Sequence, residues 1–303
     1  MSYADWIAVD WGTTHLRAWA MADDGRVLAA ASSDAGMGSL TRDGFEPALL
    51  ALAEGWLAPG RATLALACGM VGSRQGWVEA PYRPVPCVPL EPGGFASAPC
   101  GDGRLTVRVI PGIKQLSPAD VMRGEETQIA GFLASEPEFD GVLCLPGTHN
   151  KWVRISAGEI VSFQTFMTGE MFALLSEHSV LRHSVGGEGW DEHAFTLALD
   201  DLLSRPERLA ARLFSLRAEA LLSGLAPATA RARLSGALIG AELAAARPYW
   251  LGQSIAVIGA SGIGGAYAAA LARQGAAPRV VEGDRITLAG LAAAHALLQE
   301  TAR

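Results

Sequence analysis

The chain has 303 residues; half are hydrophobic, 18% are charged, and the formal net charge is −7. This length can bury two hydrophobic cores, and the composition is opposite to that of disordered proteins. The negative charge argues against nucleic acid or an anionic membrane surface as a partner.

The four cysteines show no C-x-x-C spacing, as is typical of thiols in a reducing compartment. The first residues lack the basic and apolar regions of a signal peptide. No uncharged apolar run is long enough to cross a bilayer. We therefore expect a cytoplasmic protein without a membrane partner.

The first half of the chain predicts a mixed α/β lobe. Strands are predicted at residues 6–10, 16–22, 27–33, 64–67 and 105–110, and a helix at 43–57. The stretch 81–103 is rich in proline and glycine and is expected to form a loop. Ser117 and Pro118 suit the N-cap and first position of a helix, which predicts a helix from there to about Ala134.

The second half opens with the same order of elements. Strands are predicted at residues 141–145, 151–155, 159–166, 255–258 and 280–281, and helices within 170–247 and at 286–301. This mixture predicts two α/β lobes, an N-terminal lobe at residues 1–135 and a C-terminal lobe at residues 136–303.

A strand that ends in a Gly-Thr turn occurs once in each half. The two turns are Gly12-Thr13-Thr14 and Gly147-Thr148-His149. Glycine lets the backbone approach a ligand closely, and threonine adds a hydroxyl donor. Two ordinary β-hairpins are the alternative, which the duplication disfavours. We expect the turns to grip the phosphates of a nucleotide from two sides.

Asp10 ends the strand before the first turn. A carboxylate there can hold Mg²⁺ through water beside a transferring phosphate, whereas a turn-capping aspartate is the alternative. The second copy has Leu145-Pro146 where the first has Asp10-Trp11. The second turn is therefore expected to bind phosphate without binding metal directly.

Glu125 and Glu126 form a second acidic candidate, expected inside the helix that begins near Ser117. Adjacent side chains on a helix point about 100° apart, so at most one can face a given cleft. One could act as general base on a substrate hydroxyl, and a solvated glutamate pair is the alternative. Gly124 within a helix costs about 1 kcal/mol relative to alanine, which favours a functional role.

The turn at residues 259–264 has the glycine-rich composition of phosphate-binding turns between a strand and a helix. Too few residues follow it to complete a Rossmann domain. We therefore expect it to face adenosine or the α-phosphate, with a simple packing turn as the alternative.

These segments together resemble the sugar kinase/actin/heat-shock-protein ATPase superfamily, and the whole chain is similar to the bacterial 2-dehydro-3-deoxygalactonokinase family. The matching stretches, in chain order, are residues 10–14, 16–19, 69–73, 80–82, 122–128, 146–149, 151–153, 167–170 and 236–242. The resemblance implies two actin-like ATPase (ribonuclease H-like) lobes around a central nucleotide cleft. It also implies phosphorylation of the 6-hydroxyl of 2-dehydro-3-deoxy-D-galactonate by ATP with Mg²⁺, in galactonate catabolism.

The resemblance also carries site residues. Asp10 would be catalytic and hold the metal, and Glu125 or Glu126 would be the base, by similarity to a Gly-x-Glu-Glu segment of exopolyphosphatases. ATP would be bound by Gly12, Thr13, Thr14, Gly147, Thr148, His149, Lys151, Gly259, Ala260, Ser261 and Gly262. The sugar acid would be bound by Arg17, Gly69, Met70, Ser73, Arg74, Tyr82, Arg83 and Arg123, whose arginines suit a carboxylate.

Other functions of the same fold stay open at this point. They are a kinase for another 2-keto-3-deoxy sugar acid, a phosphohydrolase acting on polyphosphate, and a non-catalytic sugar-sensing protein. A polyphosphatase should need a basic channel, of which this acidic chain gives little sign, and a regulator would be expected to lose Asp10. The expected partners are the sugar acid and ATP, and a homo-oligomer is left open.

Overall fold

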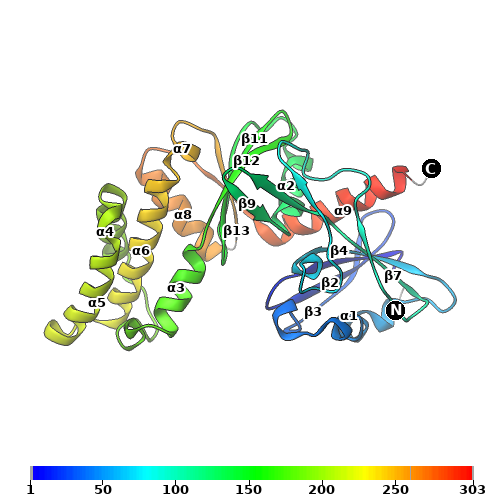
Figure 1. Cartoon of the computed structure of the whole chain (residues 1–303), viewed down its shortest axis with the longest axis horizontal. Helices are drawn as coiled ribbons and strands as arrows, with labels where there is room; N and C mark the ends of the chain where they lie inside the picture. The colour runs from blue at the N-terminus through cyan, green and yellow to red at the C-terminus, as the bar shows by residue number, and fades with distance from the viewer. Residues whose placement is uncertain (1–2, 260, 302–303) are drawn as a thin grey trace. The chain divides into compact units, whose positions relative to one another are not determined.

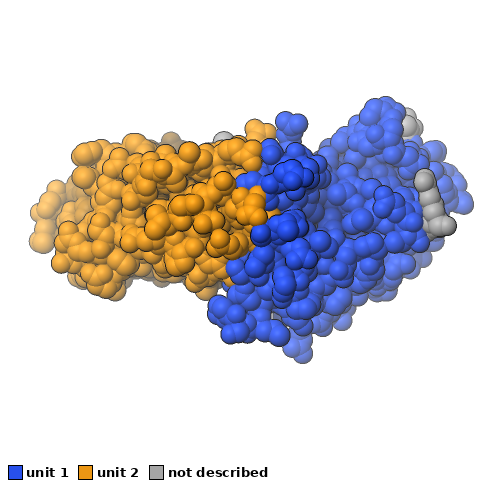
Figure 2. Space-filling model, turned by 90° about the horizontal axis from the view of Figure 1, so that it is seen from above, with its two compact units in different colours: residues 1–139, 156–162, 283–303 blue, residues 140–155, 163–282 orange. Residues whose placement is uncertain are grey.

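The computed structural model describes residues 3–259 and 261–301, with Ser261 described by its backbone alone. The chain forms two compact units, which Figure 2 colours separately. Unit 1 comprises Met1–Phe139, Ser156–Ser162 and Gly283–Arg303, and unit 2 comprises Asp140–Ile155 and Phe163–Glu282. This grouping differs from the expected lobes 1–135 and 136–303, because the C-terminal helix belongs to unit 1.

Unit 1 is built on a mixed sheet with the strand order β3-β2-β1-β4-β7-β6, and a smaller sheet has the order β5-β8-β9. The elements are β1 (Trp6–Trp11), β2 (Leu16–Met21), β3 (Val27–Ser33), α1 (Phe45–Ala53), β4 (Thr63–Gly69), β5 (Tyr82–Pro84), β6 (Ala96–Ala98), β7 (Leu105–Val109), β8 (Gly112–Leu116), β9 (Ala119–Met122), α2 (Glu125–Ser135) and α9 (Gly283–Thr301). Strands β1, β4 and β7 run parallel, so their C-terminal ends meet at one edge.

Both faces of the large sheet are buried. Val9 and Trp11 point to the face covered by α1, where the Trp11 and Phe45 rings lie 5.0 Å apart. Ala8 and the alternate residues of β4 pack on the other face against Leu291 of α9. Burial on both sides explains why the central strands are almost continuously apolar.

Helices α2 and α9 lie in direct contact through two glycines. A Cβ atom added to Gly290 would lie 1.8 Å from the carbonyl oxygen of Thr127, and one added to Gly131 would lie 2.0 Å from that of Ile286. Only glycine therefore allows this approach, which fixes the position of α2 on the sheet.

The expected helix from Ser117 to Ala134 is wrong over its first eight residues. Leu116 pairs with Ala119 across the β8–β9 hairpin, and α2 begins only at Glu125. Pairing between strands that the local sequence does not reveal overrides the helix-start pattern. The expected loop at 81–103 likewise contains β5 and β6.

The second sheet has the strand order β12-β11-β10-β13-β14, the same sequence of neighbours as β3-β2-β1-β4-β7. Its elements and those of unit 2 are β10 (Gly141–Leu145), β11 (Asn150–Ser156), β12 (Glu159–Phe166), α3 (Thr168–Glu177), α4 (Glu192–Ser204), α5 (Leu209–Ser223), α6 (Pro227–Ala245), α7 (Arg247–Trp250), β13 (Ile255–Gly259), α8 (Ser261–Arg273) and β14 (Arg279–Glu282). Strand β10 is antiparallel to β11 and parallel to β13, as β1 is to β2 and β4. The duplicated topology confirms the predicted mixed α/β class.

Helices α4, α5 and α6 run side by side in Figure 1 and form the helical part of unit 2. Apolar side chains of α4 and α6, among them Phe195, Leu199 and Ile239, pack together with Trp152 of β11 in one core. Within residues 3–259 and 261–301, no helix combines the length and apolar character needed to cross a membrane.

Candidate active site

The C-terminal edge of the large sheet in unit 1 holds an ion-paired carboxylate. Asp10 on β1 lies opposite Arg17 on β2, and its Oδ2 accepts hydrogen bonds from Arg17 Nη2 at 2.5 Å and Nε at 3.2 Å. Arg17 also donates to Asp284 in the first turn of α9. The thiol of Cys68 lies 3.8 Å from Asp10 Oδ1. One arginine is therefore shared by two acidic residues.

An open cavity of about 640 Å³ lies at this edge. It is lined by Asp10, Gly12, Thr14, His15, Arg17, Ser32, Ser33 and Asp34. Gly12 donates its N–H to His15 O at 2.9 Å, which closes the turn and leaves Thr13 and Thr14 exposed. The turn thus presents its threonines to solvent beside Asp10, as predicted for a phosphate loop.

Two glycines bring the acid pair to the same edge. Gly69 ends β4 with φ +91°, and Gly124 precedes α2 with φ +104°, both values that favour glycine. A Cβ atom on Gly124 would lie 3.3 Å from Gly69 Cα. Glu125 and Glu126 therefore occupy the first turn of α2 next to the end of β4, and not the interior of a helix as expected.

The two glutamates have different environments. Glu125 is partly exposed, and its Oε2 accepts the N–H of Arg123 at 2.9 Å. Glu126 is fully buried and accepts the N–H of Gly124 at 2.7 Å and the hydroxyl of Thr127 at 3.1 Å. Burial, with the charge of Glu125 second, raises the pKa of Glu126 to about 7. Only Glu125 is placed to contact a ligand directly.

The four candidate arginines differ in their partners. Arg123 is buried over the Tyr82 ring, with its guanidinium carbon 4.2 Å from the ring centroid, and it donates to Ala80 O at 2.8 Å. Arg83 pairs with Glu91 at 3.3 Å. Arg17 is engaged by two aspartates.

Arg74 is exposed in the loop after β4. In the part of the chain that the structure describes, its guanidinium has no hydrogen bond or ion pair. A short 3₁₀ turn, Met70–Gly72, precedes it and places Met70 and the buried Ser73 beside Gly69. Arg74 is thus the candidate with a guanidinium open to a ligand.

The second Gly-Thr turn lies between β10 and β11 in unit 2. Gly147 donates its N–H to Asn150 Oδ1 at 2.7 Å, so this N–H is not available to phosphate as expected. Residues 147–149 are exposed, and His149 Nε2 lies 2.5 Å from Glu170 Oε2. Lys151, also expected to bind ATP, is only 4% exposed in β11.

The glycine-rich turn after β13 lies beside this loop. A Cβ atom on Gly259 would be 3.6 Å from Pro146 Cδ, because β10 and β13 are parallel neighbours. Gly262 is exposed in the first turn of α8. The predictions at Ala260 and at the Ser261 side chain lie outside the described residues.

A cavity of about 430 Å³ adjoins the start of α8. Gly262, Ile263, Gly265, Ala266 and Ala269 line it from α8, and Trp190, Glu192, Phe195 and Ser235 line it from the other side. Trp190 is 46% exposed and donates its indole N–H to Glu192 at 2.8 Å. The sequence gave no sign of Trp190, because it precedes α4 outside any motif.

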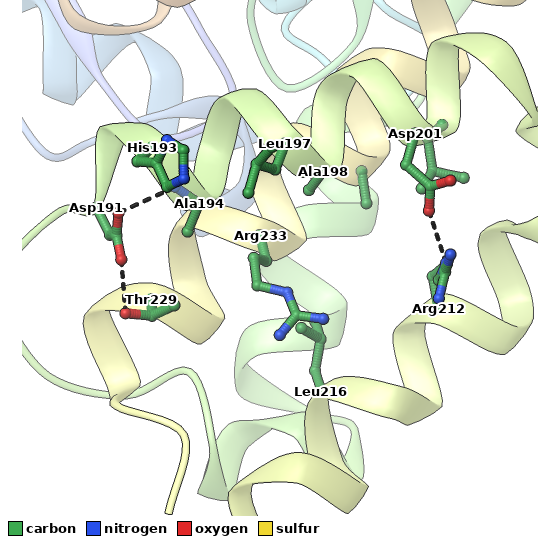
Figure 3. A pocket seen from close by; sticks show the side chains of 12 residues that line it. Asp191, His193, Ala194, Leu197, Ala198, Asp201, Arg212, Leu216, Thr229 and Arg233 are labelled. Atoms are coloured by element: carbon green, nitrogen blue, oxygen red, sulfur yellow. Dashed lines mark hydrogen bonds and ion pairs between the residues drawn. The ribbon is translucent and has the colours of Figure 1, made fainter.

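A further cavity of about 440 Å³ lies between α4, α5 and α6 (Figure 3). Its charged side chains already have partners. Asp191 accepts the Thr229 hydroxyl at 2.8 Å, Arg212 donates to Asp201 at 2.7 Å, and Arg233 donates to Glu219 at 2.6 Å. This cavity contains none of the predicted site residues.

Comparisons with known proteins agree with this architecture. The family model described as 2-keto-3-deoxy-galactonokinase matches residues 10–294. A Rhizobium meliloti relative named "Probable 2-dehydro-3-deoxygalactonokinase DgoK1" is 40% identical, with 95% of each chain covered. The Escherichia coli 2-dehydro-3-deoxygalactonokinase is 35% identical, with 97% of this chain and 99% of the relative covered.

A crystal structure from Sinorhizobium meliloti, provisionally described as a 2-dehydro-3-deoxygalactonokinase, superposes with a TM-score of 0.86 at 39% identity. The alignment covers 95% of this chain and 97% of that one. The fold is therefore that of the actin-like sugar kinases, and the predicted resemblance is confirmed along almost the whole chain. The chain belongs to the 2-keto-3-deoxy-galactonokinase family of carbohydrate kinases.

Proposed function

We propose that this kinase transfers the γ-phosphate of ATP to the 6-hydroxyl of 2-dehydro-3-deoxy-D-galactonate, giving a product for an aldolase in galactonate breakdown. The observation that carries the proposal is the family match over residues 10–294. The two curated relatives, whose names give this activity, match the chain at both ends, so no lobe of the enzyme is missing from the comparison.

Asp10 is proposed as the acidic residue beside the transferring phosphate. Mg²⁺ binds proteins through one or two carboxylates and keeps waters and phosphate oxygens as its other ligands. Asp10 fits this requirement, because Arg17 occupies its Oδ2 and its Oδ1 has only a thiol at 3.8 Å. When bound, the ion would neutralise charge on the phosphates.

Glu125 is proposed as the group that accepts the proton of the sugar hydroxyl or orients it. A general base must come within hydrogen-bond reach of that hydroxyl, which excludes the fully buried Glu126 from direct contact. Glu126 instead binds the N–H of Gly124 and holds the first turn of α2. Its role is to position Glu125.

Arg74 is proposed to bind the carboxylate of the sugar acid. A guanidinium binds a carboxylate through two parallel hydrogen bonds, and those of Arg17 and Arg83 already serve acidic residues of the chain. Arg74 follows β4, whose C-terminal end neighbours that of β1 in the parallel pair. The carboxylate would thus lie on the same edge as Asp10.

ATP is proposed to bind the loop at residues 146–149 and the cavity at the start of α8. Trp190 offers an aromatic face for a base, and Glu192 and Ser235 offer polar groups beside it. The glycines of α8 leave room for the backbone to approach the nucleotide.

An ADP-release assay tests the function with ATP, Mg²⁺ and a panel of 2-keto-3-deoxy aldonates. We expect the galacto isomer to give the highest kcat/KM, and Asp10→Asn to lower kcat by at least about 10²-fold, the scale of a lost major electrostatic contribution. The matched control is Asp24→Asn, which changes an exposed aspartate of the β2–β3 turn. A preference for another aldonate would reassign the substrate, and activity on polyphosphate alone would contradict the kinase.

A further inference from the structure

A buried carboxylate lies behind the loop at residues 146–149 of unit 2. Glu242 of α6 is 3% exposed. Its Oε1 accepts the indole N–H of Trp152 at 2.8 Å, and its Oε2 accepts Asn150 Nδ2 at 2.8 Å and the Tyr267 hydroxyl at 2.5 Å. Burial raises the pKa of Glu242, whereas these donors oppose that shift.

The partners of Glu242 define its role as an acceptor. An indole N–H and an amide –NH₂ can only donate, so both carboxylate oxygens must accept. A buried carboxylate that lost such donors would be strongly destabilised. The direction of every hydrogen bond at this site is therefore set by the carboxylate.

Asn150 carries this direction to the loop. Because its Nδ2 faces Glu242, its Oδ1 must face the opposite way, where it accepts the N–H of Gly147 at 2.7 Å. An inverted amide would place two donors against each other at Gly147. Glu242 thus selects the one amide orientation that closes the turn.

The loop has little room to adopt another shape. A Cβ atom on Gly169 would lie 2.2 Å from Gly147 O, so the start of α3 packs directly on the turn. The N–H of Glu170 also donates to Thr148 O at 2.9 Å. The turn is held from one side by α3 and from the other by Asn150.

We propose that Glu242 is a positioning residue for nucleotide binding, which acts through Asn150 to hold the 146–149 loop in the shape that receives the phosphates of ATP. The proposal rests on the proposed function of this loop. Nothing in it requires Glu242 to touch the nucleotide. It separates Glu242 from ordinary core residues, whose loss would weaken both substrates alike.

Glu242→Gln tests the proposal, because a glutamine side chain keeps the shape but adds a donor and frees the Asn150 amide to invert. We expect KM for ATP to rise at least about tenfold, the scale of one disrupted buried hydrogen bond, while KM for the sugar acid changes less than about twofold. The increase in Tm that ATP alone produces should also shrink. An unchanged KM for ATP in a folded variant would overturn the proposal.

Trp152→Phe is the matched control. It removes a buried donor from the other oxygen of Glu242 and leaves the contacts of Asn150 in place. It should lower Tm without changing KM for ATP, and an equal rise in KM for ATP would also overturn the proposal. If Glu242→Gln fails to fold, Asn150→Ala decides, because it breaks the link to Gly147 directly and should reproduce the ATP defect.

A wild-type enzyme without activity on any sugar acid would contradict the proposed function instead. The ATP-induced increase in Tm needs no sugar acid, so it tests the positioning role independently of the substrate assignment.

Discussion

At the scale of single residues, the structure distinguishes side chains that the sequence leaves equivalent. Arg17, Arg74, Arg83 and Arg123 are all candidates for a carboxylate by residue type. Arg17 and Arg83 pair with acidic residues, and Arg123 is buried against Tyr82 and Ala80. Exposure and partners, which depend on folding, are what separate Arg74 from the others.

Arg74→Ala should raise KM for the sugar acid at least about tenfold, because a charge-assisted bidentate contact is lost, and should leave KM for ATP unchanged. Steady-state kinetics with each substrate varied separately measures the two effects. Arg26→Ala serves as the control, since it removes another exposed arginine, paired with Asp24 in a distant turn. Unchanged sugar-acid kinetics would place the carboxylate elsewhere.

Glu126 gives a pH-dependent prediction. Its pKa is raised from 4.5 to about 7 in the folded protein, mainly by burial and then by Glu125. The native state therefore holds this proton while the unfolded state releases it, so the free energy of unfolding falls as pH rises between these values and stays lower above them. The difference corresponds to about 3 kcal/mol.

Glu126→Gln should remove this contribution, so that the variant loses less stability than the wild type between about pH 4.5 and 7. Urea unfolding at a series of pH values measures the difference. Glu138→Gln, at an exposed position after α2, should keep the wild-type dependence. Parallel curves for wild type and Glu126→Gln would refute the assigned pKa.

At the scale of elements, the contact between α2 and α9 determines where the acid pair lies. Gly290→Ala should destabilise the protein by about 1–3 kcal/mol, because the new methyl group would overlap the carbonyl oxygen of Thr127. It should also lower kcat, since α2 would shift together with Glu125. Thermal unfolding and steady-state kinetics measure the two effects.

The control for that variant is Gly265→Ala in α8, where an added Cβ meets nothing within 4 Å. Alanine is the better helix former by about 1 kcal/mol, so this change should stabilise the protein. Equal effects of the two substitutions would show that helix propensity, and not the close contact, controls stability at Gly290.

At the scale of the whole molecule, the two units should respond to different ligands. A non-hydrolysable ATP analogue should slow amide hydrogen exchange at residues 146–150 and 259–269, and the sugar acid should slow it at residues 12–15 and 69–74. Bound ligands stabilise the segments that they contact, and exchange reports that stabilisation locally. Sugar-acid protection confined to unit 2 would contradict the proposed sites.

The sequence by itself determined the duplicated strands, the two Gly-Thr turns and the kinase family. These features are local: an apolar strand followed by glycine and threonine sets its own backbone. The helix expected from Ser117 failed because β-pairing depends on strands that are distant in sequence. Only the tertiary structure decided that Glu126 is buried, that Asp284 reaches Arg17, and that Glu242 holds Asn150. Those contacts join residues far apart in the chain, where packing sets burial and partners and no local pattern records them.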